Sequence, residues 1–356
     1  MPEISARESW DSEHLRGPVT RLPYGVTRYY ASLAGTLDPG TDPIAAQFVP
    51  QDAETAALSY ESADPIGDSR YLVAERLVHR YADRALLLVS DRCAAYCRHC
   101  FRRHFTGHGG GQITEEQLDR ACEYLASAPA VREVLLSGGD PLMLSDKDLG
   151  HVMDRLLQVD PTYILRICTR MPVVQPARIT GDVAEMLGRT GSVWAVIHAN
   201  HHRELTDEFR AAVRRLITSG VPVLNQAVLL RGINDRVETL EALFRGLVRA
   251  GVKPYYLFQG DLAAGTAHFR VPLEQGIALM RELRSRLSGI ALPTYAVDLP
   301  GGAGKVPVES SLLRVEKETY VLRGPDGKEH FYPREAWQDS GGHPGAGGDR
   351  PFTDPG

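Results

Sequence analysis

The chain of 356 residues has a net charge of −5, with 43% hydrophobic and 24% charged residues. This composition is ordinary for a globular protein, and the negative charge argues against a global basic field that attracts nucleic acid. No apolar run is long enough to span a bilayer, and the polar start, Met1 to Trp10, lacks the pattern of a signal peptide. We therefore expect a cytoplasmic protein that binds neither nucleic acid nor a membrane.

Strand and helix patterns alternate through the middle of the chain. Residues 1–84 are expected to form helical and loop segments outside the core. Apolar, β-branched runs follow at 85–90, 133–137, 163–168, 193–198, 222–229 and 254–259. From the second run onward they recur about every thirty residues, the length of a strand and its crossover helix. Helical periodicity occupies 207–217, 237–247 and 273–287, and Thr114 to Gln117 resembles a capping box. This alternation predicts an α/β fold, a partial (βα)6 barrel over 85–290 with function at the carboxyl ends of its strands.

Residues 291–337 follow the predicted barrel. Within them, 311–333 are expected to form a β-hairpin that turns at Gly324-Pro325-Asp326-Gly327. Residues 338–356 are rich in Gly, Pro and Asp, and we expect this tail to be disordered.

The chain contains five cysteines: Cys93, Cys97, Cys100, Cys122 and Cys168. An odd number, with three inside eight residues, argues against a disulfide framework and favours a metal or cluster site in a reducing compartment. Cys122 falls on the apolar face of a predicted helix and Cys168 at the end of a predicted strand. We interpret these two as buried small hydrophobic residues.

Cys93, Cys97 and Cys100 form the pattern CxxxCxxC directly after the first predicted strand. Three thiolates on one loop can hold three corners of a [4Fe–4S] cluster and leave the fourth iron open to a small molecule. A structural zinc site with His99 as fourth ligand is the competing interpretation. In this place in a βα barrel, the pattern resembles the motif of the radical SAM superfamily. The resemblance implies that the open iron binds S-adenosylmethionine (SAM).

The second predicted strand ends in Ser137-Gly138-Gly139-Asp140. Glycine lets the backbone approach a ligand closely, although paired glycines also end strands in ordinary βα turns. Next to the cysteine motif, this segment resembles the Gly-Gly-Asp segment of radical SAM enzymes, which contacts the SAM amino group.

The resemblance becomes closer over residues 79–307, which are similar to lysine 2,3-aminomutase. The matching segments follow one another at family-like spacing: HRYADR at 79–84, YCRHCFRR at 96–103, LSGGD at 136–140, TRMPVV at 169–174, NQAVLLRGIND at 225–235 and VDLPGGAGK at 297–305. The resemblance implies an isomerase that converts L-lysine to β-lysine through a 5′-deoxyadenosyl radical. Its cofactors would be a [4Fe–4S] cluster, SAM and pyridoxal 5′-phosphate (PLP).

The glycine-rich turn from Pro300 ends in Lys305. It is not a Walker A loop, because Leu299 stands where the first glycine should be and Val306 where Ser or Thr should follow the lysine. A solvated lysine on a plain loop is the remaining alternative. The resemblance implies instead that Lys305 forms the Schiff base with PLP, a role that suits a flexible turn.

Other positions of the PLP and SAM sites are also implied by the resemblance. Arg80 and Arg84, four residues apart and expected on one side of a helical or turn segment, match the ligands of the PLP phosphate. The resemblance places Tyr81, which lies between them in sequence, beside this phosphate. His198 and Gln226, expected at strand ends, match positions that line the SAM and PLP pocket.

Substrate recognition is assigned through the same resemblance. Arg102 matches the residue that pairs with the substrate carboxylate, for which a guanidinium is suited. Asp261 and Asp298 match two carboxylates that hold the ε-ammonium of lysine, and such a pair repels itself unless a cation lies between. Arginine and ornithine stay open as substrates. A cluster-bearing or zinc-bearing binding protein without catalysis is the hypothesis from a different class.

The chain departs from the family pattern at several positions. Phe101 and His104 stand where the lysine enzymes have Thr and Arg, and Pro141 where Ala is common. Arg236 stands where clostridial-type enzymes carry a cysteine ligand to an intersubunit zinc, and no cysteine follows Cys168. We therefore expect no zinc. Self-association into a homo-oligomer, and an electron donor such as flavodoxin or ferredoxin, are the expected partners.

Overall fold

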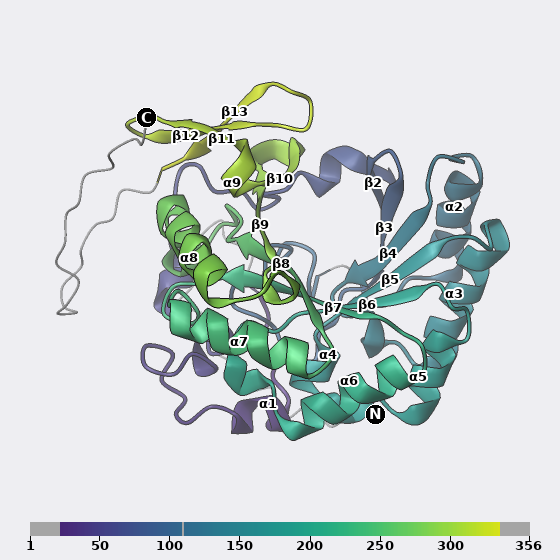
Figure 1. The fold of residues 1–356 in the computed structure, drawn as a ribbon. Coiled ribbons are helices and arrows are strands. Elements are labelled where there is room, and N and C mark those ends of the chain that lie inside the picture. The colour runs from purple at the N-terminus through teal and green to yellow at the C-terminus, as the bar shows by residue number, and fades with distance from the viewer. Residues whose placement is uncertain (1–21, 109, 335–356) are drawn as a thin grey trace.

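The computed structural model describes residues 22–108 and 110–334, so the predicted tail at 338–356 and the first part of the N-terminal extension lie outside the described residues (Figure 1). Within that part of the chain, ten strands form one sheet in chain order. They are β1 (Leu72–Ala74), β2 (Leu77–Tyr81), β3 (Arg84–Ser90), β4 (Glu133–Gly138), β5 (Ile164–Thr169), β6 (Val193–Ile197), β7 (Val223–Leu229), β8 (Lys253–Gln259), β9 (Thr294–Leu299) and β10 (Gly304–Pro307).

Neighbouring strands from β3 to β9 are parallel. The six predicted strands correspond to β3 through β8, and the predicted α/β fold with a partial barrel is confirmed. Parallel strands need crossover connections, and helices supply them between most of these strands. The helices are α1 (Arg28–Ser32), α2 (Glu115–Ala126), α3 (Asp146–Val159), α4 (Met171–Val174), α5 (Gly181–Gly188), α6 (Asp207–Thr218), α7 (Val237–Arg249), α8 (Leu273–Arg286) and α9 (Val308–Ser311).

Burial alternates along the strands and identifies the face that can hold ligands. In β7, residues 223, 225, 227 and 229 are buried, whereas 224, 226 and 228 are partly exposed. Figure 1 shows the long helices along the outer side of the curved sheet, and Val223, Ala227 and Leu229 of the buried set belong to the apolar core between sheet and helices. The partly exposed set therefore faces the inner, concave side of the sheet.

The N-terminal extension contains strands in addition to the expected helical and loop segments. Apart from the short α1, its described part consists of loops, the strands β1 and β2, and 3₁₀ helices at Ala45–Gln47, Asp52–Thr55 and Asp68–Tyr71. Strands β1 and β2 extend the sheet beyond β3 as antiparallel neighbours. The reason is that β3 has an edge whose backbone groups need partners, and the preceding residues supply them.

The C-terminal region also contains more strand than expected. Strand β10 pairs antiparallel with β9, so the sheet has antiparallel additions at both ends. The expected hairpin around 324–327 is present as β12 (Thr319–Arg323) and β13 (Glu329–Pro333), and β11 (Leu312–Val315) makes it a three-stranded sheet. Across the described residues, every helix is too short or too polar to cross a bilayer.

Replacing Gly188 by alanine tests the packing of α5 against α6. Alanine normally favours a helix over glycine by about 1 kcal/mol. Here, however, a Cβ at Gly188 would collide with the carbonyl oxygen of Ser219, which caps α6. We expect Gly188→Ala to lower the free energy of unfolding by about 1–3 kcal/mol, as overpacking does, in urea denaturation. Gly181→Ala, at the other end of α5, is the matched control because its Cβ would meet no described atom within 4 Å. Equal stability of the two variants would contradict this packing.

Candidate active site

The three clustered cysteines lie on the loop after β3, at the carboxyl edge of the parallel strands. Burial raises the pKa of the Cys93 and Cys100 thiols, and the charge of Asp140 raises that of Cys93 further. Such thiols ionise readily only beside a cation, which bound iron supplies. In the described part of the chain, no three His, Cys, Asp or Glu side chains converge as ligands of a single metal ion. A four-iron cluster has no such requirement, because each thiolate binds a different iron. The donor set, Cys93, Cys97 and Cys100, therefore fits a cluster.

A buried carboxylate of the N-terminal extension binds this cysteine loop. Glu54 accepts hydrogen bonds from Arg98 Nη2 at 2.6 Å and from Arg103 Nη2 at 2.7 Å. Burial alone would raise the pKa of Glu54, but the arginine hydrogen bonds and charges outweigh it and hold the pKa below its ordinary value. The backbone N–H of Arg98 also donates to the carbonyl of Gln47 at 2.9 Å. The loop is thus fixed by segments of the extension.

The paired glycines at the end of β4 let two backbone segments meet. A Cβ at Gly138 would collide with the carbonyl of Ser90, and a Cβ at Gly139 with the backbone of Arg92, the residue before Cys93. The N–H of Gly139 donates to the Ser90 carbonyl at 2.6 Å. These glycines therefore make room for the cysteine loop, and their contact with SAM stays a prediction.

Asp140 joins the ends of β4 and β5. Its buried carboxylate accepts hydrogen bonds from the Thr169 hydroxyl at 2.8 Å, the Arg170 N–H at 2.7 Å and the Leu142 N–H at 3.0 Å. Burial raises the pKa of Asp140, although these bonds act in the opposite direction. Ser137 lies on the partly exposed inner face of β4. Contact of either residue with SAM stays a prediction.

His198 and Gln226 lie on neighbouring parts of the sheet. His198 follows β6, and its ring stacks on His99 with the centroids 5.5 Å apart. Burial, helped by the charge of Arg170, lowers the pKa of His198 to about 3, so the imidazole is neutral near pH 7. Gln226 lies in the middle of β7, and the expectation of a strand end was wrong because β7 continues to Leu229. Its side chain is on the inner face.

Lys305 lies on β10, an edge strand, and not on a free loop as expected. Gly302, with φ of +81°, helps to turn the chain between β9 and β10. The antiparallel register then sets Lys305 opposite Asp298, with Nζ 3.6 Å from a carboxylate oxygen. The ammonium also lies 4.1 Å from the ring centroid of Phe258 and 5.1 Å from that of Tyr256. Cation–π contact and ion pairing together orient this amine.

Arg80, Tyr81 and Arg84 come together at the β2–β3 hairpin. Of the two expected placements, helix or turn, the structure has the turn, because residues 82 and 83 reverse the chain so that Tyr81 pairs with Arg84 across two strands. Both guanidinium groups stack on the Tyr81 ring, at 4.9 Å and 3.9 Å from its centroid. Arg80 Nη2 is 3.4 Å from Asp298, and the Tyr81 hydroxyl accepts the backbone N–H of Lys305 at 3.1 Å. The predicted PLP residues are therefore neighbours.

Asp261 and Asp298 lie on adjacent elements, after β8 and on β9. Burial, together with repulsion from Asp298, raises the pKa of Asp261 to about 8, although Lys305, Arg102 and Arg80 act in the opposite direction. At pH 7 the Asp261 carboxyl is thus mostly protonated. A further cation between the two carboxyls would favour its ionised form.

Arg102 is already paired within the protein. Its Nε and Nη2 atoms are each 2.9 Å from the Asp68 carboxylate, and both side chains are buried. The guanidinium carbon lies 4.7 Å from the ring centroid of Phe101. Sequence reasoning missed Asp68, as it missed Glu54, because a lone acidic residue in a loop carries no local pattern that marks it.

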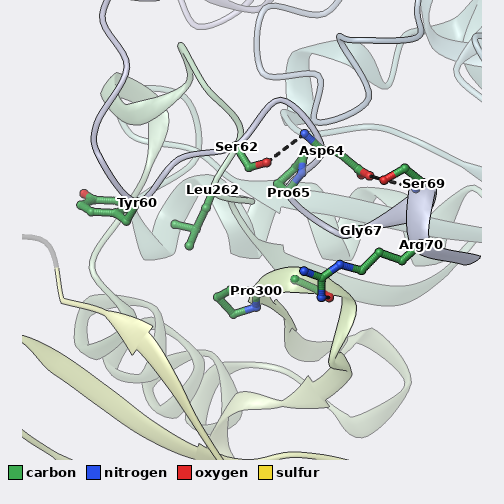
Figure 2. A pocket seen from close by; sticks show the side chains of 10 residues that line it. Tyr60, Ser62, Asp64, Pro65, Gly67, Ser69, Arg70, Leu262 and Pro300 are labelled. Atoms are coloured by element: carbon green, nitrogen blue, oxygen red, sulfur yellow. Dashed lines mark hydrogen bonds between the residues drawn. The ribbon is translucent and has the colours of Figure 1, made fainter.

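A pocket of about 320 Å³ lies between the extension and the lysine turn. Figure 2 shows the Arg70 side chain reaching toward this turn, and its Nη1 donates to the carbonyl of Gly301 at 3.0 Å. The Tyr71 hydroxyl donates to the carbonyl of Gly302 at 3.1 Å. The extension therefore forms one wall beside the turn and holds it from outside.

Known proteins resemble most of this chain. Residues 87–244 match the radical SAM superfamily, and residues 280–341 match the family described as lysine-2,3-aminomutase. L-lysine 2,3-aminomutase of Clostridium subterminale is 41% identical over 310 residues, which cover 87% of this chain and 74% of that protein. L-lysine 2,3-aminomutase of Fusobacterium nucleatum is 43% identical over 309 residues, which cover 86% of this chain and 72% of that protein. Glutamate 2,3-aminomutase of Clostridioides difficile is 35% identical over 321 residues, which cover 89% of this chain and 75% of that protein. With the parallel barrel and the cysteine loop, these similarities show that the chain is an isomerase belonging to the lysine 2,3-aminomutase family of radical SAM enzymes.

Proposed function

We propose that this chain is a PLP-dependent radical SAM enzyme that converts L-lysine to β-lysine by migration of the amino group between adjacent carbons. The observation that carries the proposal is one grouping of side chains. Lys305 and Arg80 pair with Asp298, and the charges of Asp298, Lys305, Arg102 and Arg80 all act on the pKa of Asp261. The 41–43% identity to the named lysine enzymes, against 35% to the glutamate enzyme, supports lysine as the substrate.

The residues present fit the cofactors that this reaction needs. When bound, a [4Fe–4S] cluster with SAM supplies the 5′-deoxyadenosyl radical, and PLP supplies a π-system that spreads an unpaired electron. We assign cluster binding to Cys93, Cys97 and Cys100. Arg80 and Arg84 offer two guanidinium groups, both stacked on the Tyr81 ring, that are suited to the PLP phosphate.

The remaining residues are assigned to PLP and to SAM. Lys305, already oriented by its neighbours, would hold PLP covalently, with Tyr81 against its backbone. The proposed SAM contacts are Ser137, Gly138, Gly139, Asp140, His198 and Gln226. Of these, Asp140 would act mainly by keeping the ends of β4 and β5 together.

For the substrate, we assign the carboxylate to Arg102 and the side-chain ammonium to the Asp261–Asp298 pair. Asp68 binds the Nε and Nη2 edge of Arg102, which fixes the plane of the guanidinium. A neutral or acidic side chain cannot relieve the repulsion between the two carboxyls, so the pair disfavours glutamate. Arginine and ornithine are the second candidates, because their side chains also end in a cation.

Three further parts of the proposal concern partners. A low-potential one-electron donor, such as a flavodoxin or ferredoxin, would reduce the cluster. Self-association is proposed without an intersubunit zinc, because Arg236 occupies the position of a family zinc ligand. The substrate is a free amino acid.

Removing any one of the three cysteines should abolish cluster binding. We expect Cys93→Ala, Cys97→Ala and Cys100→Ala to lose the cluster, because each thiolate binds a separate iron. The measurement is iron and sulfide analysis after anaerobic reconstitution. Cys122→Ala and Cys168→Ala are the matched controls and should keep it. Retention of a full cluster in the triple variant would disprove the assignment.

Covalent trapping should identify the PLP lysine. Borohydride reduction of the PLP-loaded protein should fix the cofactor on Lys305, as peptide mapping would reveal. Lys253 is a built-in control, because its ammonium donates to the carbonyls of Ile290 and Leu292 at 2.9 Å each and is occupied there. A label on Lys253 or on Lys317 would refute the assignment.

Replacing either aspartate by asparagine should weaken the use of lysine. A charge-assisted hydrogen bond contributes about 1.5–3 kcal/mol, so Asp261→Asn and Asp298→Asn should each lower kcat/KM for lysine by at least about tenfold. Because the pKa of Asp261 is near 8 without substrate, an incoming ammonium should make it release a proton at pH 7. Calorimetry in buffers of different ionisation enthalpy should show this proton for the wild type and not for Asp261→Asn.

Cluster content and PLP absorbance of both aspartate variants serve as controls and should stay unchanged. Losses in the double variant need not add, since it also removes the mutual repulsion. Unchanged lysine kinetics in both single variants would mean that the side chain is recognised elsewhere, and lysine would lose its place as the favoured substrate.

A further inference from the structure

Arg170, the first residue after β5, points its side chain at the cysteine loop. Its Nη1 atom donates to the Sγ atom of Cys97 at 2.7 Å, a short charge-assisted contact with a proposed cluster ligand. Arg170 belongs to the TRMPVV segment, and neither its motif nor the proposed function gives it a role. The side chain is buried, so this cation lies in a region of low dielectric.

Three groups fix the other side of the guanidinium. Nη2 lies 2.8 Å from the Tyr30 hydroxyl, 2.6 Å from Gln47 Oε1 and 2.7 Å from Glu204 Oε1. The Glu204 side chain is fully buried and also accepts the Tyr30 hydroxyl at 2.5 Å. The backbone N–H of Arg170 donates to Asp140 at 2.7 Å. The guanidinium therefore has one fixed position, which two residues of the N-terminal extension help to define.

A fixed cation beside a cluster ligand changes the free energy of adding an electron. One-electron reduction by an external low-potential donor makes the cluster more negative by one charge. A guanidinium at Cys97 stabilises that reduced state, and hydrogen bonds to the sulfurs are among the factors that set cluster potentials. Burial strengthens the effect, because charges interact more strongly at low dielectric. The negative charge of Glu204, on the other side of Arg170, opposes it.

We propose that Arg170 is a positioning residue that raises the midpoint potential of the cluster and so makes its reduction easier. Tyr30, Gln47 and Glu204 hold it in the place where it does so. The inference rests on the proposed function, because it requires Cys97 to bind the cluster. It also gives the N-terminal extension a role at the cysteine end of the site, in addition to its contacts with the lysine turn.

The test is an EPR-monitored redox titration of the reconstituted full-length protein with dithionite, without SAM. For Arg170→Gln, we expect the ratio of reduced to oxidised cluster at a given ambient potential to fall about tenfold, which is a negative shift of about 59 mV for a one-electron couple. Arg170→Lys, which keeps the charge, should shift less. Glu204→Gln removes the opposing charge and should shift the potential in the positive direction. Shifts of opposite sign are an electrostatic signature that structural damage does not produce.

Iron and sulfide analysis comes before each titration. Wild-type protein without a cluster would overturn the proposed function. Equal potentials in wild type and in Arg170→Gln, at equal iron content, would overturn only this inference, even if the variant bound SAM more weakly. If Arg170→Gln cannot hold the cluster, the midpoint potential of Glu204→Gln decides the test, and an unchanged or lower potential in that variant rejects the inference.

Arg178→Gln is the matched control, since Arg178 donates to the carbonyls of Leu142 and Leu144 instead of to a cysteine. It should leave the potential unchanged, and a shift as large as that of Arg170→Gln would also reject the inference.

Discussion

Glu54 is a buried carboxylate that pairs with two arginines of the cysteine loop, Arg98 and Arg103. Separating them would strand buried charges, and an uncompensated buried charge is strongly destabilising. The same holds for Arg102 and Asp68, which connect the loop to a later part of the extension. The cysteine loop and the N-terminal extension therefore form one structural unit, and the shape of the site depends on both.

Charge is balanced differently at the two ends of this site, beside the cysteines and around Lys305. Beside the cysteines, Arg170 is matched by Glu204, and both are buried. Around Lys305, the carboxyls Asp261 and Asp298 repel each other strongly enough to help raise the pKa of the first to about 8. The Arg170–Glu204 pair is thus matched within the protein, although the neighbouring thiols ionise readily only once iron binds. A further cation between Asp261 and Asp298, which lysine supplies under the proposed function, would favour the ionised form of Asp261.

The strands, helices and site residues that could be predicted from the sequence are those marked by local patterns. Strands β3 to β8 and helices α6 to α8 follow from apolar periodicity, and the cysteines, the paired glycines and Lys305 from short motifs. Periodicity does not predict β1, β2 and β10, because three to five residues hold little of it. Strand β9 lies beyond residue 290, where the predicted barrel ends, and is therefore not among the predicted strands. Glu54 and Glu204 could not be recognised, since their arginine partners lie 44 and 34 positions away.

The hydrogen bonds from Arg70 and Tyr71 to the lysine turn affect the order in which this chain can fold during its synthesis. Arg70 and Gly301, like Tyr71 and Gly302, are 231 positions apart. At about 5–20 residues per second, a ribosome needs roughly 10 to 50 s to make the second partner after the first. Glu54 needs far less time to meet Arg98, only 44 positions later. The cysteine end of the site can therefore assemble early on the nascent chain, whereas the lysine end must wait until nearly all of the barrel has been translated.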